Sequence, residues 1–260
     1  MNIINFDDIP QYDDGLRRNK HWLAPQVPFQ LLCAGGTSCG KTTVVLNLLL
    51  RYLFYEFLFV YTRSPEQSKF RLLRDYCKQT GINLTFGTTA QEIVTPEQLR
   101  RGHDKVAHAQ DNPMQEAHAE SAQAAVAQED GEEESSASFP QTVVVVDDFM
   151  LDKVAQDRVG NLMSRGRHVN ASVIFTTQCF YQVPRHIRLN CGYYMIWRMP
   201  SVREVHQLYM DVVGSDLTRE QFTEVFSEAT KDKHDFLLID LRTECAQLRM
   251  RQNFDGIWLE

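Results

Sequence analysis

The stretch Gly35-Gly36-Thr37-Ser38-Cys39-Gly40-Lys41-Thr42 matches the pattern G-x-x-x-x-G-K-[ST] at every position. The apolar run Phe29–Ala34 precedes it and predicts a buried strand, and the segment from Thr42 to Tyr55 predicts a helix. Glycines allow a tight turn whose backbone N–H groups point inward at a phosphate, and the start of the following helix adds positive potential. The stretch therefore predicts a phosphate-binding loop between a strand and a helix.

The residues expected to hold a nucleotide lie in this loop and at the start of the helix. Lys41 is expected to reach the β- and γ-phosphate oxygens, and the Thr42 hydroxyl is expected to ligate magnesium. The predicted nucleotide-binding set is Gly35, Gly36, Thr37, Ser38, Cys39, Gly40, Lys41, Thr42 and Thr43.

Two acids follow a run of four valines, Val143 to Val146, which predicts a central strand because it is β-branched and apolar on both faces. On a parallel strand adjacent to the one that enters the loop, these acids would lie at the same sheet edge as the phosphates. Asp147 is then expected to hold magnesium through water, and Asp148 to polarise the attacking water. Glutamate more often has this second role, because its extra methylene reaches further.

A third strand, expected from Ala171 to Thr176, is followed by Gln178. An amide at this place can sense a γ-phosphate or position a water molecule. Arginines flank the strand in the segments 164–168 and 183–190, without a matching run of acids. They are candidates for pairing with the phosphates of a nucleotide or a nucleic acid, and equally for solvated helix ends and surface ion pairs.

Strand-like and helix-like segments alternate along the chain, which is typical of a parallel sheet with crossover helices. Further strands are expected at Phe57–Tyr61, Tyr193–Trp197 and Phe236–Leu241. Helices are expected from Ser64-Pro65 to Gly81, from Asp152 to Arg165, from Val202 to Val213 and from Arg219 to Thr230. The predicted fold class is α/β, with a mostly parallel central sheet flanked by helices.

The negative charge of the chain is concentrated in one segment. The formal net charge of the 260 residues is -7, but residues 104–140 alone hold nine acids and one base. This segment contains no Leu, Ile, Tyr or Trp, so it cannot bury enough apolar area to offset the entropy of ordering it. We expect a disordered acidic insertion, and a nearly neutral remainder that can present a local basic surface.

Composition excludes several other classes of protein. The six cysteines form no C-x-x-C pair, which argues against a zinc site and against a disulfide framework. The apolar runs fall short of the roughly 18 residues that a membrane span needs. Acids stand near the N-terminus where a signal peptide would carry Lys or Arg. These features predict an intracellular protein without a membrane span.

The order of these motifs resembles that of the poxvirus-type genome-packaging ATPases, which belong to the FtsK/HerA superfamily and occur in large DNA viruses, virophages and virus-like transposons. The resemblance runs from Phe29 to Trp197. It rests on the phosphate loop, the strand with two acids, a helix ending in Gly166-Arg167-His168, the strand before Gln178, and the segment Pro184 to Asn190. The fold that it implies is that of a RecA/FtsK-like P-loop NTPase.

The resemblance also implies roles for individual residues. Lys41 and Thr42 would bind the phosphates of ATP and Mg²⁺, and Asp147 and Asp148 would form the acidic pair. Gln178 would be the sensor of the γ-phosphate. An arginine finger reaching the ATP of a neighbouring subunit would be either Arg167 or Arg188.

The function implied is that of a hexameric ring that hydrolyses ATP to push double-stranded DNA into a preformed capsid. Its partners would be DNA of any sequence, further copies of the chain, and capsid or portal-vertex proteins, at virion assembly sites inside the host cell or in the virion. Candidate DNA-contacting stretches are Arg63 to Arg74 and the arginines Arg242, Arg249 and Arg251. Two alternatives are a nucleotide kinase and an ATP-bound assembly scaffold with little turnover.

The expected domain organisation places one ATPase core around the acidic insertion. Residues 1–28 form an N-terminal arm, and residues 29–103 and 141–200 form the core. The insertion occupies residues 104–140. Residues 201–260 form a C-terminal extension of helices and a strand within the same domain.

Overall fold

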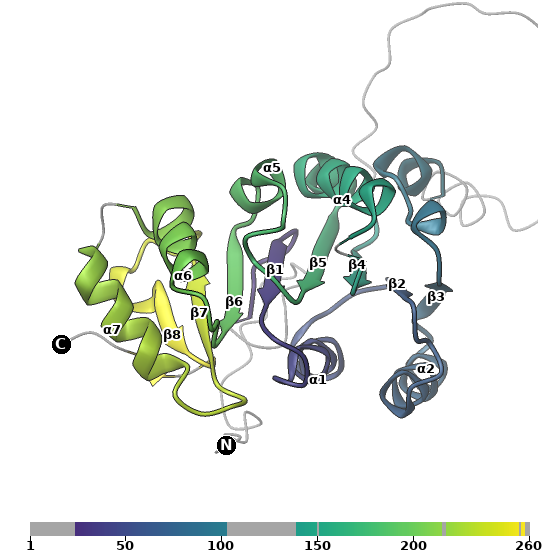
Figure 1. Cartoon of the computed structure of the whole chain (residues 1–260). Coiled ribbons are helices and arrows are strands. Elements are labelled where there is room, and N and C mark those ends of the chain that lie inside the picture. The colour runs from purple at the N-terminus through teal and green to yellow at the C-terminus, as the bar shows by residue number, and fades with distance from the viewer. Residues whose placement is uncertain (1–23, 103–138, 150, 215–216, 255, 258–260) are drawn as a thin grey trace, which may run out of the picture.

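One nine-stranded sheet organises the part of the chain that this computed structural model describes, which is residues 24–102, 139–149, 151–214, 217–254 and 256–257 (Figure 1). The strand order across the sheet is β3-β2-β4-β5-β1-β6-β7-β8-β9. The strands are β1 (Gln30–Ala34), β2 (Phe57–Thr62), β3 (Asn83–Gly87), β4 (Thr142–Asp147), β5 (Ala171–Thr177), β6 (Tyr193–Trp197), β7 (Phe236–Asp240), β8 (Met250–Gln252) and β9 (Gly256–Ile257). The pairs from β3 to β6 in that order are parallel, and those from β6 to β9 are antiparallel. The predicted α/β fold with a mostly parallel sheet is confirmed.

The central strands are buried on both faces of the sheet. Along β4, Val143 and Val145 enter one hydrophobic core, and Val144 and Val146 enter the other. Successive side chains of a strand point to opposite faces, so an unbroken apolar run is what a doubly covered strand requires. The four valines therefore fill both cores at once.

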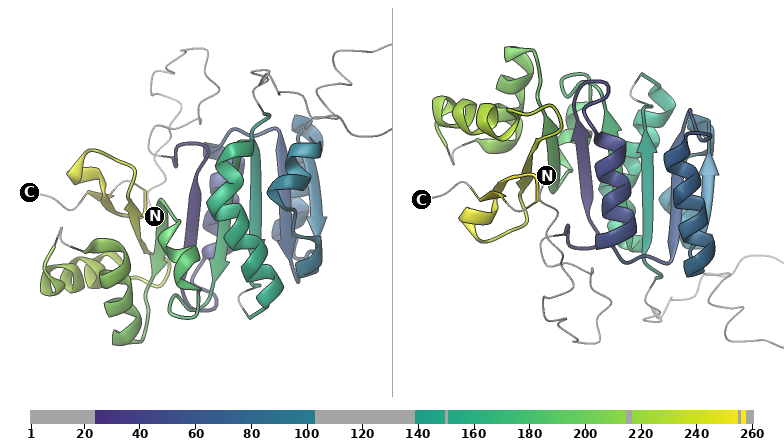
Figure 2. Two further views of the ribbon diagram at one scale, coloured as in Figure 1. Left: turned by 90° about the horizontal axis from the view of Figure 1, so that it is seen from above. Right: turned by 90° about the horizontal axis from the view of Figure 1, so that it is seen from below.

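Helices cover both faces of the sheet (Figure 2). On one face lie α1 (Lys41–Asn47), which continues as a π-helix (Leu48–Tyr52), and α2 (Ser68–Thr80). The other face is covered by α4 (Lys153–Arg165), α5 (Arg185–Leu189), α6 (Val202–Leu208) and α7 (Arg219–Ala229). A π-helix (Tyr209–Val213) follows α6. Loops at the two edges where the strands end are thus left uncovered by these layers.

The helix expected from Ser64-Pro65 begins later than predicted. The Gln67 N–H donates to the carbonyl of Ser64 (3.4 Å), so Pro65 occupies the second position of a turn and not the first turn of a helix. The helix itself starts at Ser68. Its predicted end is confirmed, because Gly81 follows with a left-handed φ of 73°.

The strand next to β1, where the phosphate loop begins, is not the one expected. β4 was expected next to β1, but β5 lies between them and pairs with both. Crossover connections set strand order, and local sequence does not encode it. The sequence also leaves β3, α5, β8 and β9 unpredicted, because these elements are short or carry few apolar residues.

Some of the expected segments lie outside the described residues. These are residues 1–23 of the N-terminal arm, residue 103 of the expected core and residues 104–138 of the acidic insertion. In the C-terminal extension, β7 pairs with β6 and so continues the same sheet. A search of the described helices finds none long and apolar enough to span a membrane.

Candidate nucleotide-binding site

The phosphate loop connects β1 to α1 through strained backbone. Ser38 has φ 61° and Gly40 has φ 108°, both in the left-handed region, and glycine adopts this region without a steric penalty. Gly35 is required for a different reason, because a Cβ there would lie 2.6 Å from Cβ of Trp197 in β6. The glycines therefore permit both the sharp turn and its close approach to the neighbouring strand.

Lys41 lies across the loop that precedes it. Its ammonium group donates to the carbonyls of Gly35 (2.6 Å) and Gly36 (2.8 Å). These bonds hold the positive charge over the loop, beside backbone N–H groups and the start of α1. A phosphate entering the loop would meet that charge.

Asp147 ends β4 and pairs in register with Thr176 of β5. The Thr176 hydroxyl donates to the Asp147 carboxylate. Burial raises the pKa of the Asp147 carboxyl above its ordinary value, although the bond from Thr176 and the charges of Lys41 and Lys69 act in the opposite direction. A partly buried carboxylate whose burial is not fully compensated is suited to hold a cation.

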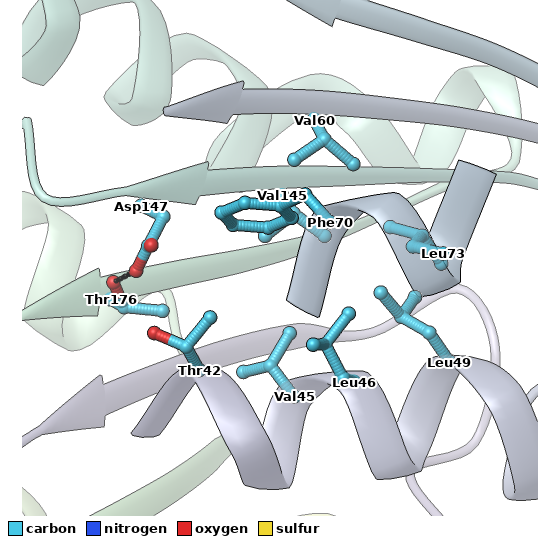
Figure 3. Close-up of a pocket in the computed structure, with 10 residues that line it drawn as sticks. All are labelled: Thr42, Val45, Leu46, Leu49, Val60, Phe70, Leu73, Val145, Asp147 and Thr176. Atoms are coloured by element: carbon cyan, nitrogen blue, oxygen red, sulfur yellow. Dashed lines mark hydrogen bonds between the residues drawn. The ribbon is translucent and has the colours of Figure 1, made fainter. Parts of the chain in front are cut away.

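Asp147, Thr176 and Thr42 lie at one end of a small cavity between the sheet, α1 and α2 (Figure 3). The cavity has about 10 Å³ of space for water, roughly enough for one molecule. Apolar side chains line its other end, as Figure 3 shows. A hydroxyl and a carboxylate are the hard oxygen ligands that Mg²⁺ prefers, and Mg²⁺ usually keeps several waters. The residues present fit a magnesium ion.

Gln178 links the phosphate loop to the acidic pair. The Thr37 hydroxyl donates to its Oε1 (3.2 Å), and its Nε2 donates to Oδ1 of Asp148 (3.0 Å). This is possible because β5 lies between β1 and β4, so that Gln178 stands between the ends of both strands. The structure therefore brings the loop, the two acids and the glutamine together.

Arg188 is paired inside its own subunit. Its side chain is buried and its Nε is 2.7 Å from the Asp211 carboxylate. The guanidinium also donates to the carbonyls of Tyr181 and Val183, and lies over the ring of Phe180. In this conformation Arg188 fixes α5 and the segment before it.

Arg167 is exposed, and lies at the opposite edge of the sheet from Gln178. It belongs to the short helix Gly166–Val169, which immediately precedes β5, whereas Gln178 follows that strand. A strand of this length spans roughly 20 Å. Arg167 is therefore far from the phosphate loop of its own subunit, and its role at a neighbour's nucleotide stays a prediction.

The sequence reasoning does not single out Lys69 as a site residue. Thr62 at the end of β2 pairs in register with Asp147, which brings the connection from β2 to α2 to the same sheet edge. The charge of Lys69, in the first turn of α2, lowers the pKa of Asp147. Nothing in the local sequence marks this lysine, because its proximity depends on strand order.

The model of a family described as "Poxvirus A32 protein" matches residues 110–250, more than half of the chain. The chain belongs to the poxvirus A32 protein family. The matched range includes the acidic pair, Gln178 and both arginine candidates, and begins after the phosphate loop. The loop is thus a separate observation that agrees with the family, and the predicted resemblance to this type of ATPase is confirmed. None of the curated proteins matches the chain.

Several solved structures resemble this one in architecture at low sequence identity. The genome packaging NTPase B204 from Sulfolobus turreted icosahedral virus 2 in complex with AMP has a TM-score of 0.48 and 11% identity, covering 86% of this chain and 96% of that chain. Its complex with ATP-gammaS has a TM-score of 0.46 and 11% identity, covering 84% and 94%. EssC (ATPases 2 and 3) from Geobacillus thermodenitrificans has a TM-score of 0.49 and 12% identity, covering 91% and 41%.

Proposed function

We propose that this member of the A32 family is an ATPase that uses ATP hydrolysis to package double-stranded viral DNA into a capsid. The observation that carries the proposal is the hydrogen-bonded chain Thr37–Gln178–Asp148, which joins the phosphate loop to the acidic pair at one sheet edge. The genome packaging NTPase B204 was solved in complex with ATP-gammaS.

ATP would bind with its phosphates in the loop 35–42. The loop N–H groups and the start of α1 would hold the α- and β-phosphates, and Lys41 would exchange its bonds to Gly35 and Gly36 for the β- and γ-phosphate oxygens. Thr42 and Asp147 would hold magnesium together with the phosphates and water. Bound magnesium neutralises the charge that develops on the phosphates during transfer.

Asp148 and Gln178 would act on the attacking water. A carboxylate at the end of β4 accepts a hydrogen bond from water and polarises it. Gln178 bonds to both Asp148 and Thr37, so a γ-phosphate that displaces Thr37 would change the position of Asp148. The glutamine thereby couples occupation of the loop to alignment of the water.

Assembly into a ring would bring an arginine finger of one subunit to the ATP of the next. Arg188 is paired with Asp211 and Arg167 lies at the opposite edge of the sheet from Gln178, so a neighbouring subunit would have to provide the finger. Arg167 is the exposed one of the two. We propose a hexamer in which Arg167 approaches the next subunit's ATP, docked on a capsid or portal vertex at a virion assembly site.

DNA contact would be independent of sequence and weakened by salt. Two of the predicted C-terminal arginines are used within the fold. Arg251 is buried beside Asp240 (3.5 Å), and Arg242 donates to the carbonyls of Gln26 and Pro28. Arg63 and Arg71 remain exposed in the other predicted stretch, and we propose them for DNA phosphates.

The test is ATP hydrolysis by the full chain measured against protein concentration, with and without long double-stranded DNA, using Lys41→Ala as the blank. A motor with a finger from its neighbour predicts a rate per subunit that climbs steeply with concentration and rises again with DNA. Phosphoryl transfer to a nucleoside monophosphate would instead identify a kinase. ATP binding with a flat, negligible rate would identify an assembly switch.

A further inference from the structure

The connection from α7 to β7 runs along the phosphate loop, far from it in sequence (Figure 1). β7 is antiparallel to β6, and Phe236 at its start pairs with Trp197 at the end of β6. The residues that enter β7 therefore lie at the sheet edge where β1 ends and the loop begins. Among them is His234.

His234 contacts the loop directly in front of Lys41. Its Nδ1 lies 3.2 Å from the carbonyl oxygen of Cys39. A carbonyl oxygen only accepts hydrogen bonds, so Nδ1 must carry the proton and donate it. The same nitrogen is 3.5 Å from the place where a Cβ on Gly40 would be, so the ring also packs against that residue.

The position of His234 is itself fixed by β6. The indole N–H of Trp197 donates to the His234 carbonyl (3.1 Å). Trp197 is fully buried, packs against Phe236 with ring centroids 4.8 Å apart, and makes the close approach to Gly35 described above. Gly35 at the start of the loop and Cys39 within it are thus both held, by β6 and by the segment that enters β7.

Peptide geometry turns this contact into a constraint on phosphate binding. In a planar trans peptide, the C=O and N–H groups point in opposite directions. A Cys39 carbonyl held outward by His234 therefore keeps the Gly40 N–H pointed toward the inside of the loop, where a phosphate would accept it. A flip of this peptide changes the φ of Gly40, which is 108°, and glycine accepts such a change without a steric penalty.

We propose that His234 is a positioning residue that stops the Cys39–Gly40 peptide from flipping, and so keeps the loop ready to bind phosphate. The inference rests on the proposed nucleotide-binding function of the loop. Through this one hydrogen bond, the antiparallel part of the sheet would affect the affinity of the loop for nucleotide.

Two replacements that resemble each other in shape, and differ in whether they can donate a hydrogen bond, isolate that hydrogen bond. His234→Asn retains a side-chain N–H that can donate to the Cys39 carbonyl, and His234→Leu fills similar space without a donor. We measure binding of ATPγS with Mg²⁺ to the full chain by calorimetry, together with the melting temperature of each variant without nucleotide. His206→Ala, an exposed histidine of α6, is the control.

The expected result is that His234→Leu binds about 10-fold more weakly than the wild type, as the loss of one aligned hydrogen bond predicts, while His234→Asn stays within about 3-fold. The melting temperatures of the two variants should agree with each other, and His206→Ala should bind as the wild type does. Equal affinities for the Leu and Asn variants would overturn the inference. Absence of binding by the wild type would overturn the nucleotide site itself, and the inference with it.

Discussion

Polar residues have different roles in the part of the sheet formed by the six parallel strands and in the part formed by the three antiparallel strands. In the parallel part, every strand ends at the same edge, so Asp147, Gln178 and the phosphate loop meet there although they are distant in sequence. In the antiparallel part, successive strands end at opposite edges, and the charges of Arg251 and Asp240 pair within the fold. Strand direction therefore decides whether polar residues collect into a site or stabilise the scaffold.

The largest expected effect on activity comes from the parallel part. Lys41→Ala removes the ammonium that lies over the phosphate loop, and ATP hydrolysis should fall by about 100-fold or more. Initial rates at saturating ATP and DNA check this. A rate within a few-fold of the wild type would show that the loop is not where the phosphates bind.

A comparably large effect on stability is expected in the antiparallel part. Arg251→Ala removes a buried cation and leaves the partly buried Asp240 carboxylate without it, and the free energy of unfolding should fall by about 3–5 kcal/mol, measured with urea. The control is Lys231→Ala, which removes an exposed pair with Glu228 and should cost less than about 1 kcal/mol. Similar losses for the two variants would contradict the assignment of Arg251 to the scaffold.

The loss of unfolding free energy caused by Arg251→Ala should depend on pH. Burial already raises the pKa of Asp240, and losing the charge of Arg251 raises it further. The penalty belongs to the ionised carboxylate, so it is present at about pH 7 and shrinks as the pH falls through the pKa of Asp240 in the folded variant. Urea unfolding of both proteins at about pH 7 and pH 5 measures this, and a deficit that grows toward pH 5 would contradict the account.

Asp147→Asn should separate binding from turnover. The amide keeps the bond from Thr176 but lacks the charge that would hold magnesium, so ATP should still bind while turnover falls by about 100-fold. Calorimetry and steady-state rates on the same preparation give both quantities. Full activity of this variant would disprove the metal assignment.

The smallest expected effect on turnover comes from replacing Gln178, which connects the phosphate loop after β1 to Asp148 after β4. Gln178→Ala should lower turnover by about 10-fold with little change in ATP affinity, because it misaligns water without removing a phosphate contact. Gln182→Ala, an exposed glutamine four residues away, serves as the control and should hydrolyse ATP at the wild-type rate. Equal rates for Gln178→Ala and Gln182→Ala would remove Gln178 from the site.

The sequence predicts the parallel part of the molecule well, because its signals are local. Four valines in a row predict β4, and the loop pattern predicts the turn between β1 and α1. Strand order is not local, which is why β5 between β1 and β4 was unexpected and why Lys69 was overlooked near Asp147.

The contacts of charged and polar side chains are the feature that the sequence predicts least well. Arg188 has the appearance of a free arginine because its partner Asp211 lies 23 residues further along the chain. His234 lies 195 residues from Cys39, with no pattern to connect them. Only the folded arrangement distinguishes an arginine that is free to meet phosphate from one that is already paired.

If the site formed by the parallel strands drives movement along DNA, the protein should displace a third strand from a duplex, and a triplex-displacement experiment measures this. The full chain, at a concentration where it hydrolyses ATP, is given a long duplex that carries a labelled third strand. The wild type with ATP and Mg²⁺ should release the third strand, and Asp147→Asn should not. Hydrolysis of ATP by the wild type without any release of the third strand would show that this site does not drive movement along DNA.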